Sequence, residues 1–151
     1  MKLTAIIITT ALLAALAAGC TSSEIAETAE TVDSDIAAVA HEGYDTVAYF
    51  AADKATMGSA QFSFIWNGAK WLFSNRENLE KFKSNPAQFA PQFGSHCPVS
   101  LANGGMQKGS PKFWKVSKDK LYFFNSKDLA DQFEKDPAPV LEKAAKNYKS
   151  E

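Results

Sequence analysis

The stretch that decides the fold is QFSFIWNGAKWLFSNREN, residues 61–78. Residues 61–66 and 69–73 are rich in aromatic side chains, which favour β-strands. Asn67-Gly68 lies between them, and this pair favours a two-residue hairpin turn because both turn positions need a positive φ. The stretch therefore predicts an antiparallel β-hairpin.

A helix is expected directly after this hairpin. Ser74 is the predicted N-cap, and Glu77 three positions later completes a capping box, in which each side chain satisfies a free backbone amide. Leu79 and Phe82 give the helix a buried face. Pro86 interrupts the helical register.

The second half of the chain predicts the same kinds of element. Residues 113–117 and 120–124 form a second expected hairpin, with Lys118-Asp119 as its turn. A helix capped by Asn125 or Ser126 follows, Asp136-Pro137 ends it, and residues 139–149 form a final helix. The predicted fold class is α+β: a single small domain of two aromatic β-hairpin–helix units with a C-terminal helix.

A weak internal repeat relates the two halves at an offset of 51 residues. The matching pairs are Trp71 with Tyr122, Phe73 with Phe124, Phe82 with Phe133, Pro86 with Pro137 and Ile65 with Val116. Two explanations remain open, a true duplication and two units that merely share their patterning. Both predict the same local structure.

The N-terminus has the features of a lipoprotein signal peptide over residues 1–19. Lys2 precedes an apolar stretch, and the small residues Ala18-Gly19 stand directly before Cys20, as in the lipobox pattern. Cys20 is therefore the predicted site of cleavage and lipidation; a cleaved signal with an incidental cysteine is the alternative. Thr21 rather than an aspartate follows Cys20, which favours an outer-membrane location facing the periplasm.

Residues 20–42 form a predicted acidic, flexible tether between the lipid and the domain of residues 43–151. This segment holds six acidic residues and no Lys or Arg. A weakly amphipathic helix over residues 25–40 is the alternative. The domain itself carries 15 basic and 11 acidic residues without a dense basic run, so a nucleic-acid partner is not expected.

Lipidation of Cys20 leaves Cys97 without a partner in the chain, because the sequence holds two cysteines. Pro98 favours the first position of a short helix, which places Cys97 at its N-cap, where the helix dipole favours a thiolate. Cys97, His96 and Met106 are the candidate ligands for a transition metal, copper or zinc. The alternatives are a buried structural cysteine and a reactive thiol.

His41, Asp45 and Tyr49 are more remote candidates for a functional site. No phosphate-binding loop and no paired carboxylates occur, and no third group can be named to orient a Cys–His pair. The sequence therefore predicts a protein without catalytic activity.

Several motifs together resemble the YHS domain family. They are GYDTVAYF at residues 43–50, Trp66-Asn67-Gly68, Trp71-Leu72-Phe73-Ser74, FAPQFG at residues 89–94 and Cys97. The resemblance covers about residues 43–148. It implies a link to related TRASH-type modules, in which paired cysteines are thought to bind metal. Here Ala48 and Phe73-Ser74 occupy those cysteine positions, and the Cys at position 97 is retained.

The predicted function is that of an envelope lipoprotein whose YHS-like domain binds a transition metal, with copper favoured, without catalysis. Its one predicted partner is the membrane, reached through the lipid on Cys20. Two alternatives come from other classes, a protein-interaction or envelope-structural module and a redox-responsive thiol protein.

Overall fold

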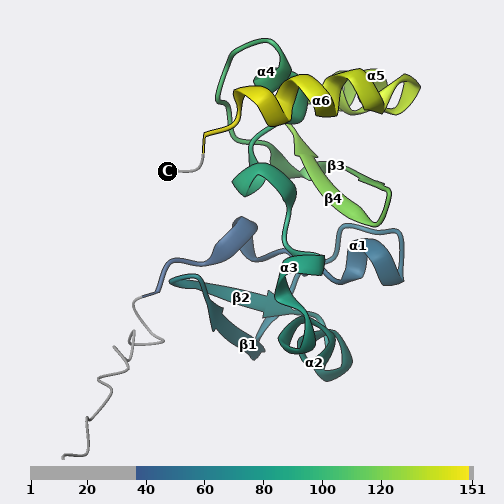
Figure 1. Ribbon diagram of the computed structural model, residues 1–151. Helices are drawn as coiled ribbons and strands as arrows, with labels where there is room; N and C mark the ends of the chain where they lie inside the picture. The colour runs from purple at the N-terminus through teal and green to yellow at the C-terminus, as the bar shows by residue number, and fades with distance from the viewer. Residues whose placement is uncertain (1–36, 150–151) are drawn as a thin grey trace, which may run out of the picture. The chain divides into compact units, whose positions relative to one another are not determined.

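The computed structural model describes residues 37–149 (Figure 1). The predicted signal peptide, Cys20 and most of the predicted tether lie outside these residues. The elements are η1 (Ala40–Gly43), α1 (Ala48–Ala51), β1 (Ser59–Trp66), β2 (Ala69–Phe73), α2 (Arg76–Ser84), α3 (Pro86–Phe89), η2 (Gln92–Ser95), α4 (Pro98–Ala102), β3 (Ser110–Ser117), β4 (Lys120–Phe124), α5 (Lys127–Lys135) and α6 (Pro137–Asn147).

The first hairpin forms as predicted, with β1 and β2 antiparallel. Asn67 and Gly68 make the turn with φ values of 49° and 70°, so both adopt the left-handed conformation that such a turn requires. Strand β1 begins at residue 59, two residues earlier than predicted. Its register shifts between Ser59 and Ser63, where β1 carries a bulge.

Helix α2 follows this hairpin, but its N-cap is Asn75 and not the predicted Ser74. The Asn75 side chain accepts a hydrogen bond from the amide of Asn78 at 2.9 Å. Ser74 is unavailable as a cap because its hydroxyl donates to the buried carboxylate of Asp45 at 2.6 Å. The predicted capping box of Ser74 and Glu77 is therefore wrong.

The second hairpin–helix unit is also confirmed. Lys118 and Asp119 form its turn with φ values of 50° and 56°, and Ser126 caps α5. Strand β3 starts at residue 110 rather than 113. Helix α6 starts at Pro137 and not at residue 139, because the fixed φ of proline suits the first turn of a helix.

The repeat at an offset of 51 residues also holds for the secondary structure. Strands β3 and β4 and helix α5 each begin and end 51 residues after β1, β2 and α2, and α6 begins 51 residues after α3. Both first strands carry the same bulge. Gly58 and Gly109 are equivalent, and an added Cβ on either would lie 2.4 Å from a backbone carbon of the facing strand. These shared irregularities go beyond what common hairpin–helix patterning requires.

The equivalence continues upstream at an offset of 52 residues. In η1 the residues His41 to Gly43 all have positive φ, and in η2 so do Phe93 to Ser95. A short bridge follows each turn, Tyr44 with Met57 and His96 with Lys108, and a short helix, α1 or α4, follows each bridge. Each half of the domain is thus a turn, a short helix, a bulged hairpin and a capped helix (Figure 1).

The buried core repeats as well. In the first half a cluster forms from Val47, Trp71, Phe73, Leu79 and Phe82, and the equivalent residues Val99, Tyr122, Phe124, Ala130 and Phe133 cluster in the second half. A third cluster contains Tyr49, Leu121 and Phe123. Because a two-stranded hairpin is marginally stable alone, this packing is what stabilises both units.

The folded part of the chain begins before the predicted boundary at residue 43. The amide of Lys70 donates to the carbonyl of Ala38 at 2.9 Å, and Val39 bridges to the same residue in a parallel sense. The predicted tether therefore does not extend to residue 42; residues 38–42 belong to the domain. Among the helices of residues 37–149, none has the length and apolar character needed to cross a membrane.

Candidate functional site

Cys97 occupies the N-cap position of α4, as predicted, with Pro98 as the first helical residue. Its side chain makes no cap hydrogen bond and has 0% exposure. It packs in the second core cluster with Phe124 and Phe133. A thiol buried among aromatic rings is chemically inert, because a reactive cysteine needs partial exposure and an electropositive surrounding.

The other two predicted metal ligands do not create an open site around that sulfur. Nδ1 of His96 lies 2.8 Å from the carbonyl oxygen of Phe93, which occupies one of its two ring nitrogens. Met106 is 44% exposed, whereas Cys97 is fully enclosed. Within residues 37–149, no three side chains among His, Cys, Asp and Glu come close enough to hold a metal ion. A metal site at these residues stays a prediction that the geometry does not favour.

Two of the more remote candidates are structural. The Asp45 carboxylate is fully buried and accepts hydrogen bonds from the Val47 amide (2.9 Å), the Ser74 amide (2.8 Å) and hydroxyl (2.6 Å), and the Asn78 side chain (2.7 Å). Tyr49 donates its hydroxyl to the carbonyl of Pro111 at 2.8 Å, and burial raises its pKa above the ordinary range. Asp45 and Tyr49 thus hold the fold together.

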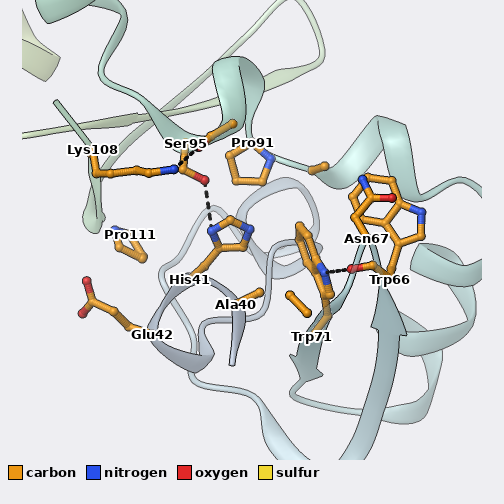
Figure 2. Close-up of a pocket in the computed structure, with 14 residues that line it drawn as sticks. Ala40, His41, Glu42, Trp66, Asn67, Trp71, Pro91, Ser95, Lys108 and Pro111 are labelled. Carbon is orange, nitrogen blue, oxygen red and sulfur yellow. Dashed lines mark hydrogen bonds between the residues drawn. The ribbon is translucent and has the colours of Figure 1, made fainter. Parts of the chain in front are cut away.

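The third remote candidate, His41, lies in a cleft of about 550 Å³ (Figure 2). The cleft forms where the two equivalent left-handed turns meet, since η1 contributes Ala40, His41 and Glu42, and η2 contributes Gly94 and Ser95. The remaining walls come mainly from the end of the first hairpin and from residues 90–91 and 108–111. This volume is in the range of sites that bind small organic molecules.

His41 connects the two turns. Its Nδ1 lies 3.1 Å from the Ser95 hydroxyl, and in Figure 2 the ring stands between Ser95 and Trp71. The imidazole packs in T-shaped contacts with Trp71 and Phe123, at centroid distances of 4.5 and 5.6 Å. Its Nε2 is buried and has no hydrogen-bond partner among residues 37–149. Burial, with a smaller effect of the Lys108 charge, lowers the pKa of His41 to about 4, so the ring is neutral at neutral pH.

A serine beside an imidazole raises the question of nucleophilic catalysis. Ser95 has a φ of 69°, and backbone strain of this kind often occurs at functional sites. However, a pKa of about 4 makes His41 a weak base at neutral pH, and none of the carboxylates of residues 37–149 is hydrogen-bonded to its second nitrogen. The pair therefore suits binding rather than acid–base chemistry.

Lys108 places a positive charge at the same side of the cleft. Its Nζ donates to the carbonyl of Gly94 at 3.1 Å, and it forms no ion pair with any residue of the range 37–149. Glu42 also lines the cleft, but its carboxylate points away from Trp71 and Trp66 (Figure 2). The positive charge of Lys108 adds a smaller effect to that of burial in lowering the pKa of His41.

Sequence reasoning named His41 but missed Ser95, Lys108 and the two tryptophans as members of one site. In the sequence, the two tryptophans have the pattern of core residues. Ser95 and Lys108 lie in an irregular segment that contains no recognisable motif. The repeat at an offset of 51 residues did not reveal the site either, because the two turns that carry His41 and Ser95 are related by an offset of 52 and only the structure shows them.

Comparison with known protein families, with curated proteins and with solved structures finds no match to this chain. The resemblance to the YHS domain family therefore stays a prediction. The function has to be argued from the geometry of the chain itself.

Proposed function

We propose that this protein is an envelope lipoprotein that binds a small organic molecule in the cleft beside His41, without catalysis. The observation that carries the proposal is the cleft itself, an apolar hollow of about 550 Å³ with polar groups gathered at one side. Ligand sites typically combine apolar walls with a few convergent polar groups that fix orientation. Here the apolar walls include Trp66, Trp71 and Pro111, and the polar groups are His41, Ser95 and Lys108.

The cleft is a better candidate than the loop around Cys97 because it is open to solvent molecules and its side chains are not all committed to the fold. The Cys97 thiol has no exposed surface and serves the core cluster of the second half. The redox alternative needs an accessible thiol and is disfavoured for the same reason.

The three tryptophans of the chain provide a direct test. Trp66 and Trp71 line the cleft, whereas Trp114 packs with Tyr49 in a different cluster and lines another surface groove. The test uses residues 20–151 with Cys20→Ser, so that no lipid competes for the probe, and follows the three indole N–H signals by NMR during titration with 2-naphthoate. A ligand of this size with ordinary efficiency predicts a Kd of about 1 mM.

Saturable shifts of the Trp66 and Trp71 signals, with Trp114 unmoved, are the expected result. Absence of any saturable shift with naphthalene, indole and phenyl probes up to their solubility would remove this function. Stoichiometric binding of Cu(I) or Zn(II) that depends on Cys97 would return the metal hypothesis to first place.

The envelope location rests on residues 1–20 and has its own test. We expect the protein made in a bacterial host to carry lipid on Cys20 and to fractionate with membranes. Cys20→Ala leaves a soluble or uncleaved chain, which mass spectrometry of the N-terminal peptide distinguishes. A lipid-free N-terminus at Cys20 in the wild type would contradict the proposed anchor.

A further inference from the structure

We infer that the cleft beside His41 is selective for planar aromatic molecules that carry one negative group, such as an aromatic carboxylate. The inference rests on the proposed binding function and adds the chemical class of the ligand. It depends on three features of the cleft, its aromatic wall, the charge at one side and the neutral state of His41.

The aromatic wall favours a flat, apolar ligand body. Trp66 and Trp71 lie in T-shaped contact with a centroid distance of 5.3 Å, and the Trp71 indole N–H donates to the carbonyl of Trp66 at 3.0 Å. The polar atom of Trp71 is thus occupied. Trp71 is only 6% exposed and backs the wall, whereas the half-buried Trp66 beside it offers the more accessible hydrocarbon surface (Figure 2). Aromatic ligands pack favourably against such rings by stacked or edge-to-face contacts.

The charge at the other side favours an anion. The Lys108 ammonium has three donors, and one of them is used by the Gly94 carbonyl at 3.1 Å. Two donors remain for a ligand, and no carboxylate of residues 37–149 pairs with this lysine. Charge-assisted hydrogen bonds to a carboxylate are about twice as strong as neutral ones, so an unpaired lysine beside an apolar wall selects for a negative group.

Because the imidazole is neutral, Lys108 is the one cation among the residues that line the cleft, and Glu42 is the one anion. Because His41 is uncharged above pH 5, it contributes shape and polarity to the cleft but no positive charge at neutral pH. Removing the ammonium of Lys108 should therefore abolish the preference for an anion while leaving the apolar contacts in place. The backbone contacts of Lys108, with His96 and with the Asn125 side chain, do not involve its ammonium and survive the substitution.

The test compares 2-naphthoate with 2-naphthamide, which has the same shape and no charge. In the chain of residues 20–151 with Cys20→Ser we expect naphthoate to bind about fivefold tighter than naphthamide at low salt, and the difference to shrink as salt rises. In Lys108→Met both probes should bind with the affinity of naphthamide. Lys112→Met is the matched control, because Lys112 is also exposed but lines a different groove.

The possible outcomes distinguish binding at the cleft from selectivity for a negative group. Binding of both probes at the cleft with equal affinity in the parent chain would overturn the charge selectivity and leave the binding function standing. Failure of both probes to bind would remove both. A preference for naphthoate that Lys112→Met abolishes and Lys108→Met does not would move the site to the other groove and overturn the inference.

Discussion

In the first half of the molecule Asp45 stands between a left-handed turn and helix α1, and in the second half Cys97 stands between the equivalent turn and helix α4. The backbone makes the same hydrogen bond at both places, since the Asp45 amide donates to Thr56 at 2.8 Å and the Cys97 amide donates to Gln107 at 2.9 Å. Both side chains have 0% exposure. The two positions share this hydrogen bond and their burial but differ in side-chain chemistry, and α4 begins directly after Cys97 whereas α1 begins at Ala48.

The surroundings of Asp45 are polar and those of Cys97 are apolar, as the two side chains require. Asp45 receives donors from Ser74 and Asn78, whereas the equivalent residues of the second half are Asn125 and Leu129. The first half closes its turn with a buried polar network and the second half closes it with apolar packing. This comparison gives Cys97 a structural explanation, because Cys97 is the apolar counterpart of a structural aspartate.

The largest expected change in unfolding free energy comes from placing an aspartate, as in the first half, at the equivalent position of the second half. Cys97→Asp buries a carboxyl group without its donors and should lower the free energy of unfolding by about 4–5 kcal/mol, measured by urea denaturation. Adding Asn125→Ser and Leu129→Asn supplies the donors of the first half. The triple variant should be more stable than the sum of its separate substitutions by about 2 kcal/mol, and strict additivity would show that the two halves are not interchangeable.

The reverse exchange tests the polar network. Asp45→Cys removes the acceptor for the Val47 and Ser74 amides and for the Asn78 side chain, and we expect a loss of about 4 kcal/mol in unfolding free energy. Asp45→Asn keeps one acceptor oxygen and the same shape, so its loss should be smaller, about 2 kcal/mol. Equal losses in the two variants would mean that the network contributes little beyond its volume.

A third difference between the halves is titratable. His41 is equivalent to Phe93, and both adopt a left-handed backbone with φ values of 48° and 54°. The pKa of His41 is about 4 in the folded protein against about 6.5 when unfolded, so the unfolded chain binds the extra proton first. The contribution of His41 to stability is therefore fully present above pH 6.5, and it falls by about 2–3 kcal/mol as the pH drops from 6.5 to 4.

His41→Phe, which copies the second half, should flatten this part of the pH profile. Urea denaturation at several pH values between 4 and 7 gives the comparison. An identical slope in wild type and His41→Phe would show that other groups cause the acid sensitivity.

The smallest effect concerns the thiol itself. In the chain with Cys20→Ser, Cys97 is the only cysteine, and it should resist a disulfide reagent such as DTNB until urea unfolds the protein. Cys97→Ala leaves a small cavity and should cost about 1–2 kcal/mol. Rapid reaction of the native thiol would show that the core cluster opens easily, and it would restore the reactive-thiol hypothesis.

The sequence predicted the elements well because their signals are local. Asn67-Gly68 defined a turn, runs of aromatic residues defined the strands, and Pro98 and the pair Asn125-Ser126 marked helix starts, with Ser126 as the actual cap. The predicted cap at Ser74 failed because a distant residue, Asp45, competes for that hydroxyl, and sequence spacing carries no information on such long-range hydrogen bonds. The predicted start of the domain, residue 43, was too late. Only Ala38 and Val39 pair with Lys70, and so short a segment leaves no hydrophobic periodicity in the sequence.

The site was harder to predict because its parts come from distant segments. His41 and Ser95 are brought together by the meeting of two turns, and neither turn has a recognisable motif at its centre. Cys97 drew attention through its chemistry, but burial decides what a thiol can do, and burial depends on the packed core. The internal repeat was a partial guide: its offset of 51 residues pairs Cys97 with Thr46, and only the structure shows the offset of 52 that places Cys97 opposite Asp45.

The attachment of Val39 beside Lys70 also determines how the domain responds to mechanical load. Tension applied from the N-terminal side enters the fold at Ala38, where one backbone hydrogen bond to Lys70 holds the chain to the hairpin edge. Peeling this segment draws Ala40 and His41 away from Trp71, which dismantles one wall of the cleft, and the hydrogen bonds of Asp45 resist any further unravelling. Displacement of this segment would therefore remove part of the cleft wall without touching the strand pairing of either hairpin.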